Sequence, residues 1–141
     1  MKVVHIARSE ISKLSFFTSW VAAGFPSPAD DYAERSLSID ELLIKHPSAT
    51  YLVRASGDSM IRRGIFDQDI LIVDRSIEAK DGDIVIAAFN GELTCKYLDL
   101  TKRCLVAANP KFPPIPIHDE QDLLIEGVVI SSIRLHRACT R

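Results

Sequence analysis

The sequence lacks any long hydrophobic run. Crossing a membrane as a helix takes about 18 or more consecutive apolar residues, and nowhere in the 141 residues does such a run occur. A span is therefore not expected, and we predict a cytoplasmic protein. Cysteine is also scarce, with only Cys95, Cys104 and Cys139 and no Cys-x-x-Cys pair. An odd number of widely spaced cysteines indicates reduced thiols, and the histidines and cysteines lack the spacing of zinc ligands. We expect no metal and no cofactor.

Excess charge of either sign is missing as well. Lys and Arg number 17 against 19 Asp and Glu, so the formal net charge is −2. Tight nucleic-acid binding needs clustered Lys and Arg. This balance argues against direct, sequence-specific DNA binding and favours a protein as the partner.

What the chain does contain is a succession of short apolar segments separated by turn residues. The apolar fraction of 47% and the charged fraction of 26% are ordinary for one globular domain. The acidic pairs Asp67/Asp69 and Asp81/Asp83 are interpreted as turn formers, because no EF-hand pattern follows them. The pattern predicts a mainly β fold, either a β-sandwich or a partly closed barrel. The predicted strands are Tyr51–Ala55, Ile70–Val73, Ile84–Phe89, Glu92–Leu98, Cys104–Ala108, Ile115–Ile117 and Leu124–Arg134.

One short helix is predicted before these strands. Ser38-Ile-Asp-Glu41 has the form of a capping box ahead of three apolar residues, and Pro47 ends the helical pattern. The proline-rich stretch Asn109–Pro116 is predicted to be a stiff surface connection.

The stretch Tyr51–Met60 points to nucleophilic chemistry. It places Ser59 on a tight turn directly after a strand-like run, and Gly57 permits backbone angles closed to other residues. Ser59 is therefore our candidate nucleophile. The same turn directs consecutive N–H groups toward one point, so the backbone amides of Asp58 and Ser59 are candidates for stabilising an oxyanion.

A serine needs a base to remove its proton. None of the four histidines offers an obvious base, although a Ser-His-Asp triad stays open because triads depend on geometry. We prefer Lys96, on the second arm of a hairpin turned by Asn90-Gly91, where Thr94 shares its face. Burial that lowers the lysine pKa by about three units, roughly 4 kcal/mol, would make it a usable base. The alternative is a solvent-facing lysine on an edge strand.

Several motifs in the same order closely resemble UmuD and its plasmid-borne relatives. These proteins are self-processing subunits of error-prone translesion DNA polymerases, and they are related to the peptidase domain of the LexA repressor. The likeness extends from Gly24 to about Ile133. It rests on the runs Gly24-Phe-Pro-Ser-Pro-Ala-Asp-Asp-Tyr32, His46-Pro-Ser-Ala-Thr-Tyr51, Ala55-Ser-Gly-Asp-Ser-Met60, Asp69-Ile-Leu-Ile-Val-Asp74 and Gly82-Asp-Ile-Val-Ile-Ala-Ala88.

The resemblance implies specific roles. The nucleophilic serine of the family falls on Ser59, its general-base lysine on Lys96, and its scissile bond on Ala23-Gly24. It implies a mobile N-terminal arm, residues 1–37, that carries the cleavage site ahead of a peptidase-like β domain, residues 38–141. It also implies a homodimer, a UmuC-like Y-family polymerase as partner, and stimulation of the cut by a RecA filament on single-stranded DNA.

Other functions fit the sequence less well. Residues 1–23 imitate a secretory signal peptide, but Glu10 interrupts the positive region and polar residues dilute the apolar core. A LexA-like repressor would need a helix-turn-helix domain before the cut site, and 23 residues do not hold one. A signal-peptidase-like enzyme would need an anchoring span. A non-catalytic interaction subunit with a vestigial dyad stays open as the alternative.

Overall fold

The computed structural model describes residues 2–4, 13–17, 23–24, 34–118 and 123–137. The chain forms two compact units. One combines Met1–Ala7 with His46–Arg141, and the other is Arg8–Lys45. The domain boundary predicted after residue 37 stays a prediction. Within the described ranges, no helix has both the length and the apolar character to cross a membrane.

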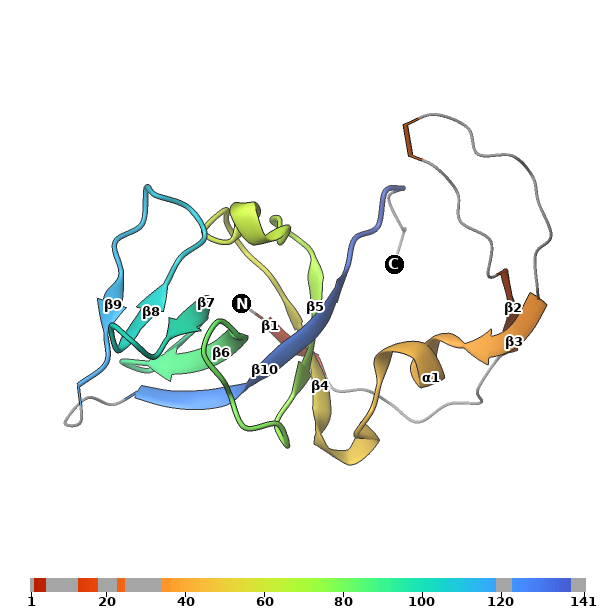
Figure 1. The fold of residues 1–141 in the computed structure, drawn as a ribbon, viewed down its shortest axis with the longest axis horizontal. Helices are drawn as coiled ribbons and strands as arrows, with labels where there is room; N and C mark the ends of the chain where they lie inside the picture. Colours follow the sequence, from red (N-terminus) through yellow and green to blue (C-terminus); the bar gives the residue numbers. More distant parts are fainter. Residues whose placement is uncertain (1, 5–12, 18–22, 25–33, 119–122, 138–141) are drawn as a thin grey trace. The chain divides into compact units, whose positions relative to one another are not determined.

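The larger unit is built on one antiparallel sheet of eight strands (Figure 1). Along the sheet the strand order is β1-β4-β5-β10-β6-β7-β8-β9. Short 3-10 turns at Pro47–Ala49 and Ile61–Arg63 flank β4 and the loop that follows it. The strands are β1 (Lys2–Val4), β4 (Thr50–Arg54), β5 (Ile70–Asp74), β6 (Ile84–Phe89), β7 (Glu92–Asp99), β8 (Cys104–Val106), β9 (Ile115–Pro116) and β10 (Leu123–Ile133).

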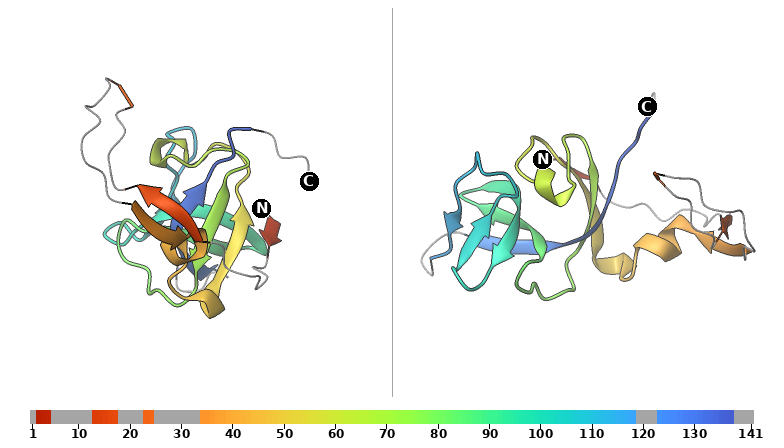
Figure 2. Two further views of the ribbon diagram at one scale, coloured as in Figure 1. Left: turned by 90° about the vertical axis from the view of Figure 1, so that its right-hand side faces the viewer. Right: turned by 45° about the horizontal axis from the view of Figure 1, so that its top comes forward.

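Strand β10 joins the two halves of this sheet, between β5 and β6 (Figures 1 and 2). Its second half pairs with β5 and its first half with β6. Each pairing contains a register shift, between Val129 and Ser131 against β5 and between Ile125 and Gly127 against β6. Such irregularities bend a strand and increase its twist. The sheet is therefore strongly curved, and the predicted mainly β fold with one short helix is confirmed.

Both faces of the sheet carry apolar side chains, as the alternation along β6 shows. Ile86 packs in one cluster, while its neighbours Val85 and Ala87 pack in another. All three are fully buried. The larger cluster consists of Tyr51, Val53, Ala55, Met60, Ile65, Leu71, Val73, Ile86, Cys95 and Ala108.

The smaller unit contains a two-stranded antiparallel ribbon and the helix. The ribbon pairs β2 (Lys13–Phe17) with β3 (Glu34–Ser38), and α1 (Ile39–Leu43) follows directly. The Ser38 hydroxyl accepts a hydrogen bond from the Glu41 N–H at 3.0 Å, as the capping pattern predicts. Strands β1, β2 and β3 were not predicted, because their pairing partners are distant in the sequence.

The predicted turn aspartates all accept backbone N–H groups, two of them within a local turn and two from loops distant in the sequence. Asp67 accepts the N–H of Gly57, Asp69 that of Phe66, Asp81 that of Leu100 and Asp83 that of Lys80. Each carboxylate satisfies a backbone donor that has no strand partner, which is the usual work of aspartate in turns.

Candidate active site

The loop that carries Ser59 begins where β4 ends. Ala55 ties its base to the next loop, donating its N–H to the Asp69 carbonyl and accepting the N–H of Gln68, both at 2.8 Å. Gly57 adopts a φ of 89°, in the left-handed region that favours glycine, and its N–H donates to Asp67 Oδ1 at 2.7 Å. The loop is therefore anchored immediately ahead of Ser59.

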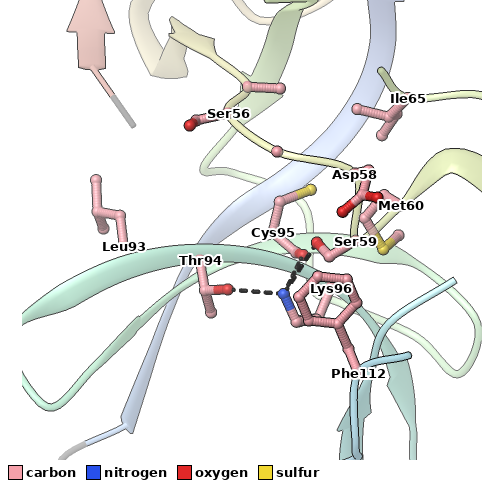
Figure 3. A pocket seen from close by; sticks show the side chains of 12 residues that line it. Ser56, Asp58, Ser59, Met60, Ile65, Leu93, Thr94, Cys95, Lys96 and Phe112 are labelled. Atoms are coloured by element: carbon pink, nitrogen blue, oxygen red, sulfur yellow. Dashed lines mark hydrogen bonds between the residues drawn. The ribbon is translucent and has the colours of Figure 1, made fainter. Parts of the chain in front are cut away.

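Lys96 approaches Ser59 from β7. This strand lies between β6 and β8 in the sheet, so it is not an edge strand, and Lys96 is only 9% exposed. Its Nζ lies 3.2 Å from Ser59 Oγ. The same nitrogen donates to Thr94 Oγ1 at 3.0 Å and to the Cys95 carbonyl at 3.1 Å (Figure 3). The structure thus brings together the two residues that the sequence singled out and contradicts the solvent-facing alternative for Lys96.

Burial favours the neutral form of this lysine. Desolvation lowers the pKa of Lys96 below its ordinary value of 10.5. A negative charge on the neighbouring Cys95 would oppose that shift, but burial raises the pKa of the Cys95 thiol to about 12. The thiol is therefore uncharged at neutral pH. Lys96 has a neutral neighbour and can accept a proton at Nζ.

The backbone beside Ser59 offers free donors. Within the described part of the chain, the N–H groups of Asp58 and Ser59 donate no hydrogen bond. Asp58 is exposed and Ser59 is half-buried, so their N–H groups can remain open to solvent or to a ligand. Here both residues line a pocket, where the donors are available to a bound carbonyl oxygen.

This pocket has a volume of about 310 Å³ and is formed by three segments of the chain. The first is the nucleophile loop, residues 55–60, with Ile65 beside it; the second is residues 93–96 of β7; the third contributes Phe112 (Figure 3). Ser59 and Lys96 share the pocket with other polar residues, including Thr94, and its apolar walls include Ile65, Leu93 and Phe112.

No histidine joins the pocket in the described part of the chain. His46 Nδ1 lies 2.6 Å from Asp74 Oδ2, and the other oxygen of Asp74 accepts from the Ser76 N–H and hydroxyl. Ser76 therefore contacts the aspartate and not the histidine, and none of these residues lines the pocket. The structure gives the Ser-His-Asp alternative no support.

The candidate scissile bond lies in the other unit. Ala23 and Gly24 are exposed members of a bend within Arg8–Lys45. A side-chain carbon added at Gly24 would meet nothing within 4 Å. The bond is open to solvent, as a cleavable bond must be.

Sequence reasoning missed two contributors to the site. Strand alternation predicts that Thr94 shares a face with Lys96, but it does not predict the hydrogen bond from Lys96 Nζ to Thr94 Oγ1. Asn109 was assigned to a surface connection, yet it is only 5% exposed and contacts the Asp58 carbonyl. The segment after it, residues 110–114, is indeed exposed. Only long-range packing reveals the role of Asn109, because its partner is 51 residues away.

The fold and the serine-lysine site define a peptidase-like domain. The Peptidase S24-like family model matches residues 15–130, and the chain belongs to this family. It is 42% identical to Protein MucA of Salmonella typhimurium over 135 residues, covering 94% of this chain and 92% of that protein. It is 40% identical to Protein ImpA of Shigella flexneri over 121 residues, covering 86% and 83%. The LexA repressor of Ectopseudomonas mendocina is 43% identical over 117 residues, covering 81% of this chain and 57% of the repressor. The resemblance to UmuD, its plasmid-borne relatives and LexA is confirmed.

Proposed function

We propose that this protein is a self-cleaving serine endopeptidase that cuts its own Ala23-Gly24 bond with a Ser59/Lys96 dyad. The observation that carries the proposal is the 3.2 Å contact between Lys96 Nζ and Ser59 Oγ inside a pocket. Membership of the Peptidase S24-like family supports the same chemistry. A general base within hydrogen-bond reach of the proton it removes is the geometric requirement for this reaction.

The reaction proceeds through an acyl-enzyme. Neutral Lys96 takes the proton of the Ser59 hydroxyl as Oγ attacks the carbonyl carbon of Ala23. The negative charge on the carbonyl oxygen is stabilised by the N–H groups of Asp58 and Ser59. The carbon–nitrogen bond then breaks, and Lys96 passes its proton to the Gly24 amine. Water hydrolyses the ester, which releases the Ala23 carboxylate and restores Ser59.

Because each chain holds one such bond, cleavage acts as a switch. We infer that the shortened protein is the active regulatory subunit of an error-prone translesion DNA polymerase in the SOS response. It would form a homodimer in the cytoplasm and join a UmuC-like Y-family polymerase after a RecA filament on single-stranded DNA has stimulated the cut. Similarity to MucA and ImpA over most of the chain supports this inference.

Intact-mass analysis tests the proposal directly. Purified wild type, Ser59→Ala and Lys96→Ala are incubated at neutral and alkaline pH, and with RecA, ATP and single-stranded DNA. We expect wild type alone to break between Ala23 and Gly24, with RecA accelerating the cut. A wild-type chain left intact under every condition would favour the non-catalytic interaction subunit. Cutting of a folded Ser59→Ala chain would remove Ser59 from the reaction.

A further inference from the structure

A loop from outside the nucleophile segment braces it. This brace loop, residues 107–112, follows β8. Its Ala108 carbonyl accepts the Arg62 N–H at 3.0 Å, and its Ala108 N–H lies 3.4 Å from the sulfur of Met60. Asn109 completes the contact by donating from Nδ2 to the Asp58 carbonyl at 3.0 Å. The brace loop therefore contacts the backbone on both sides of Ser59.

The orientation of the Asn109 amide is determined by its two partners. Its Oδ1 accepts the Lys111 N–H at 3.1 Å, while Nδ2 faces the Asp58 carbonyl. A backbone N–H needs an acceptor and a carbonyl needs a donor, so only one orientation of the amide satisfies both. Asn109 is 5% exposed, which limits competition from water for these hydrogen bonds.

The Asp58 carbonyl belongs to the same peptide group as the Ser59 N–H. In a planar trans peptide the C=O and N–H point in opposite directions, and all peptide bonds described here are trans. The Asp58 carbonyl accepts two hydrogen bonds, from Asn109 Nδ2 at 3.0 Å and from the Ile61 N–H at 3.4 Å. The shorter bond, which holds the carbonyl toward Asn109, therefore directs the Ser59 N–H away from Asn109. Asn109 does not line the pocket, whereas Ser59 does.

We propose that Asn109 is a positioning residue that locks the Asp58–Ser59 peptide so that the Ser59 N–H stays aimed at the oxyanion. The proposal rests on the proposed self-cleavage through Ser59. Asn109 touches neither the substrate nor the reacting atoms, and it acts through the backbone. An oxyanion donor must be held in place before the charge develops, because reorienting it during the reaction costs free energy.

Asparagine suits this position because its side-chain amide carries both a donor for the Asp58 carbonyl and an acceptor for the Lys111 N–H. Serine retains an acceptor for the turn at Lys111 but is too short to reach the Asp58 carbonyl. Aspartate retains the acceptor at full length but, when ionised, has no donor and sets a negative oxygen against the carbonyl. The series asparagine, serine, aspartate should therefore show progressively weaker alignment of the Ser59 N–H.

Self-cleavage rates of the full-length variants across pH test this role. We expect Asn109→Ser to cut about 10-fold more slowly and Asn109→Asp about 100-fold more slowly, because misaligning an oxyanion donor should cost less than, or at most about as much as, the roughly 10²- to 10³-fold loss caused by removing one. The midpoint of the Asn109→Ser pH–rate profile should match wild type, because Lys96 keeps its surroundings. Thr94→Val, which removes an acceptor from Lys96, should shift the midpoint instead. Asn90→Asp, the same substitution at an exposed turn, should cut like wild type.

The possible outcomes distinguish the positioning role of Asn109 from the proposed self-cleavage through Ser59. If wild type cuts and Ser59→Ala does not, self-cleavage stands, and the Asn109 series then decides the positioning role. Rates for Asn109→Ser and Asn109→Asp within about twofold of wild type would overturn that role. A shifted midpoint in Asn109→Ser would also overturn it, because the residue would then act through Lys96. Thermal unfolding is measured in parallel, and a slowing fully explained by the unfolded fraction would count against the proposal as well.

Discussion

Lys96 Nζ lies 3.2 Å from Ser59 Oγ, although the two residues are 37 positions apart and belong to different elements of the fold. The lysine comes from an inner strand and the serine from a loop beyond the end of β4. The sheet holds one partner rigidly and the anchored loop presents the other. The contact therefore exists before any substrate arrives, and several measurable consequences follow from it and from the packing around it.

Spontaneous self-cleavage should accelerate from neutral to alkaline pH. The base must be neutral Lys96, and burial lowers its pKa below the ordinary value of 10.5. Below that pKa the neutral fraction, and with it the rate, should rise about tenfold per pH unit and then level off. Intact-mass time courses without RecA give the profile. Lys96→Arg, which stays protonated, should remain uncut throughout. A flat wild-type profile would argue against a lysine base.

Gly24→Asp should block cutting while leaving the dyad intact. The bond next to Ser59 must enter the pocket with its backbone close to the nucleophile, and a charged side chain would have to be desolvated there. Local packing is not the cause, because a side-chain carbon at Gly24 meets nothing within 4 Å. Gly24→Ala, which adds little bulk, is the matched control and should still be cut. Cleavage of Gly24→Asp at the wild-type rate would place the scissile bond elsewhere.

Lys96→Met should stabilise the fold at neutral pH. The pKa of Lys96 is lower in the folded chain than in the unfolded chain. At a pH below the folded-state pKa, the buried charged lysine therefore lowers the free energy of unfolding. This destabilisation decreases as the pH rises from the folded-state pKa of Lys96 toward its unfolded-state pKa. We expect a gain of about 1 kcal/mol in unfolding free energy at pH 7, shrinking toward pH 10. Urea unfolding at several pH values measures it, with Ser59→Ala as the control. A difference that grows with pH would contradict the assignment.

Gly127→Ala should destabilise the bend in β10. A side-chain carbon at this position would lie 2.6 Å from Val73 Cγ1 and 3.1 Å from the Asp74 carbonyl oxygen. Overpacking of this kind costs about 1 to 3 kcal/mol. Val73→Ala removes the nearest clashing atom, so the double variant should lose less stability than the sum of the single variants. Strict additivity in denaturant unfolding would show that the clash is relieved elsewhere.

Arg134→Met should weaken the anchor of the loop beside the pocket. Arg134 makes a bidentate contact with Asp69, at 2.9 and 2.8 Å, and donates to the Gly64 carbonyl. Asp69 is 2% exposed, and without Arg134 its charge is buried unpaired. Because the arginine side chain is 41% exposed and water screens its charge, we expect a measurable but modest loss of unfolding free energy at pH 7.

The stability difference between wild type and Arg134→Met should depend on pH in the acid range. The hydrogen bond from Arg134 is the main cause that lowers the pKa of Asp69. The stability gained from this contact is present above the unfolded pKa of the carboxyl and is lost as pH falls through its folded pKa. The difference between wild type and Arg134→Met should therefore shrink in acid. Arg134→Lys, which cannot pair in bidentate fashion, should fall between them. A constant difference from pH 7 to pH 2 would rule out the charge contact.

The sequence by itself determined the features that depend on neighbouring residues. Strand alternation and turn residues located β4 to β10 to within a few positions, because periodicity and turn chemistry are local. Gly57 marked the sharp turn ahead of Ser59, and Ser38 marked the start of the helix. Even Lys96 could be named as a candidate base, since only its burial was in question.

Tertiary structure decided everything that depends on distant segments meeting. The sequence did not reveal that β7 is an inner strand, that Lys96 is buried beside the Ser59 loop, or that this burial lowers the pKa of Lys96. It also gave no sign that Asn109 reaches the Asp58 carbonyl or that β10 bends to join both halves of the sheet. These contacts arise when a curved sheet brings loops from separate strands to one place. They change the pKa of Lys96 and orient the Asp58–Ser59 peptide. Because each contact joins segments far apart in the sequence, no single stretch of residues predicts it.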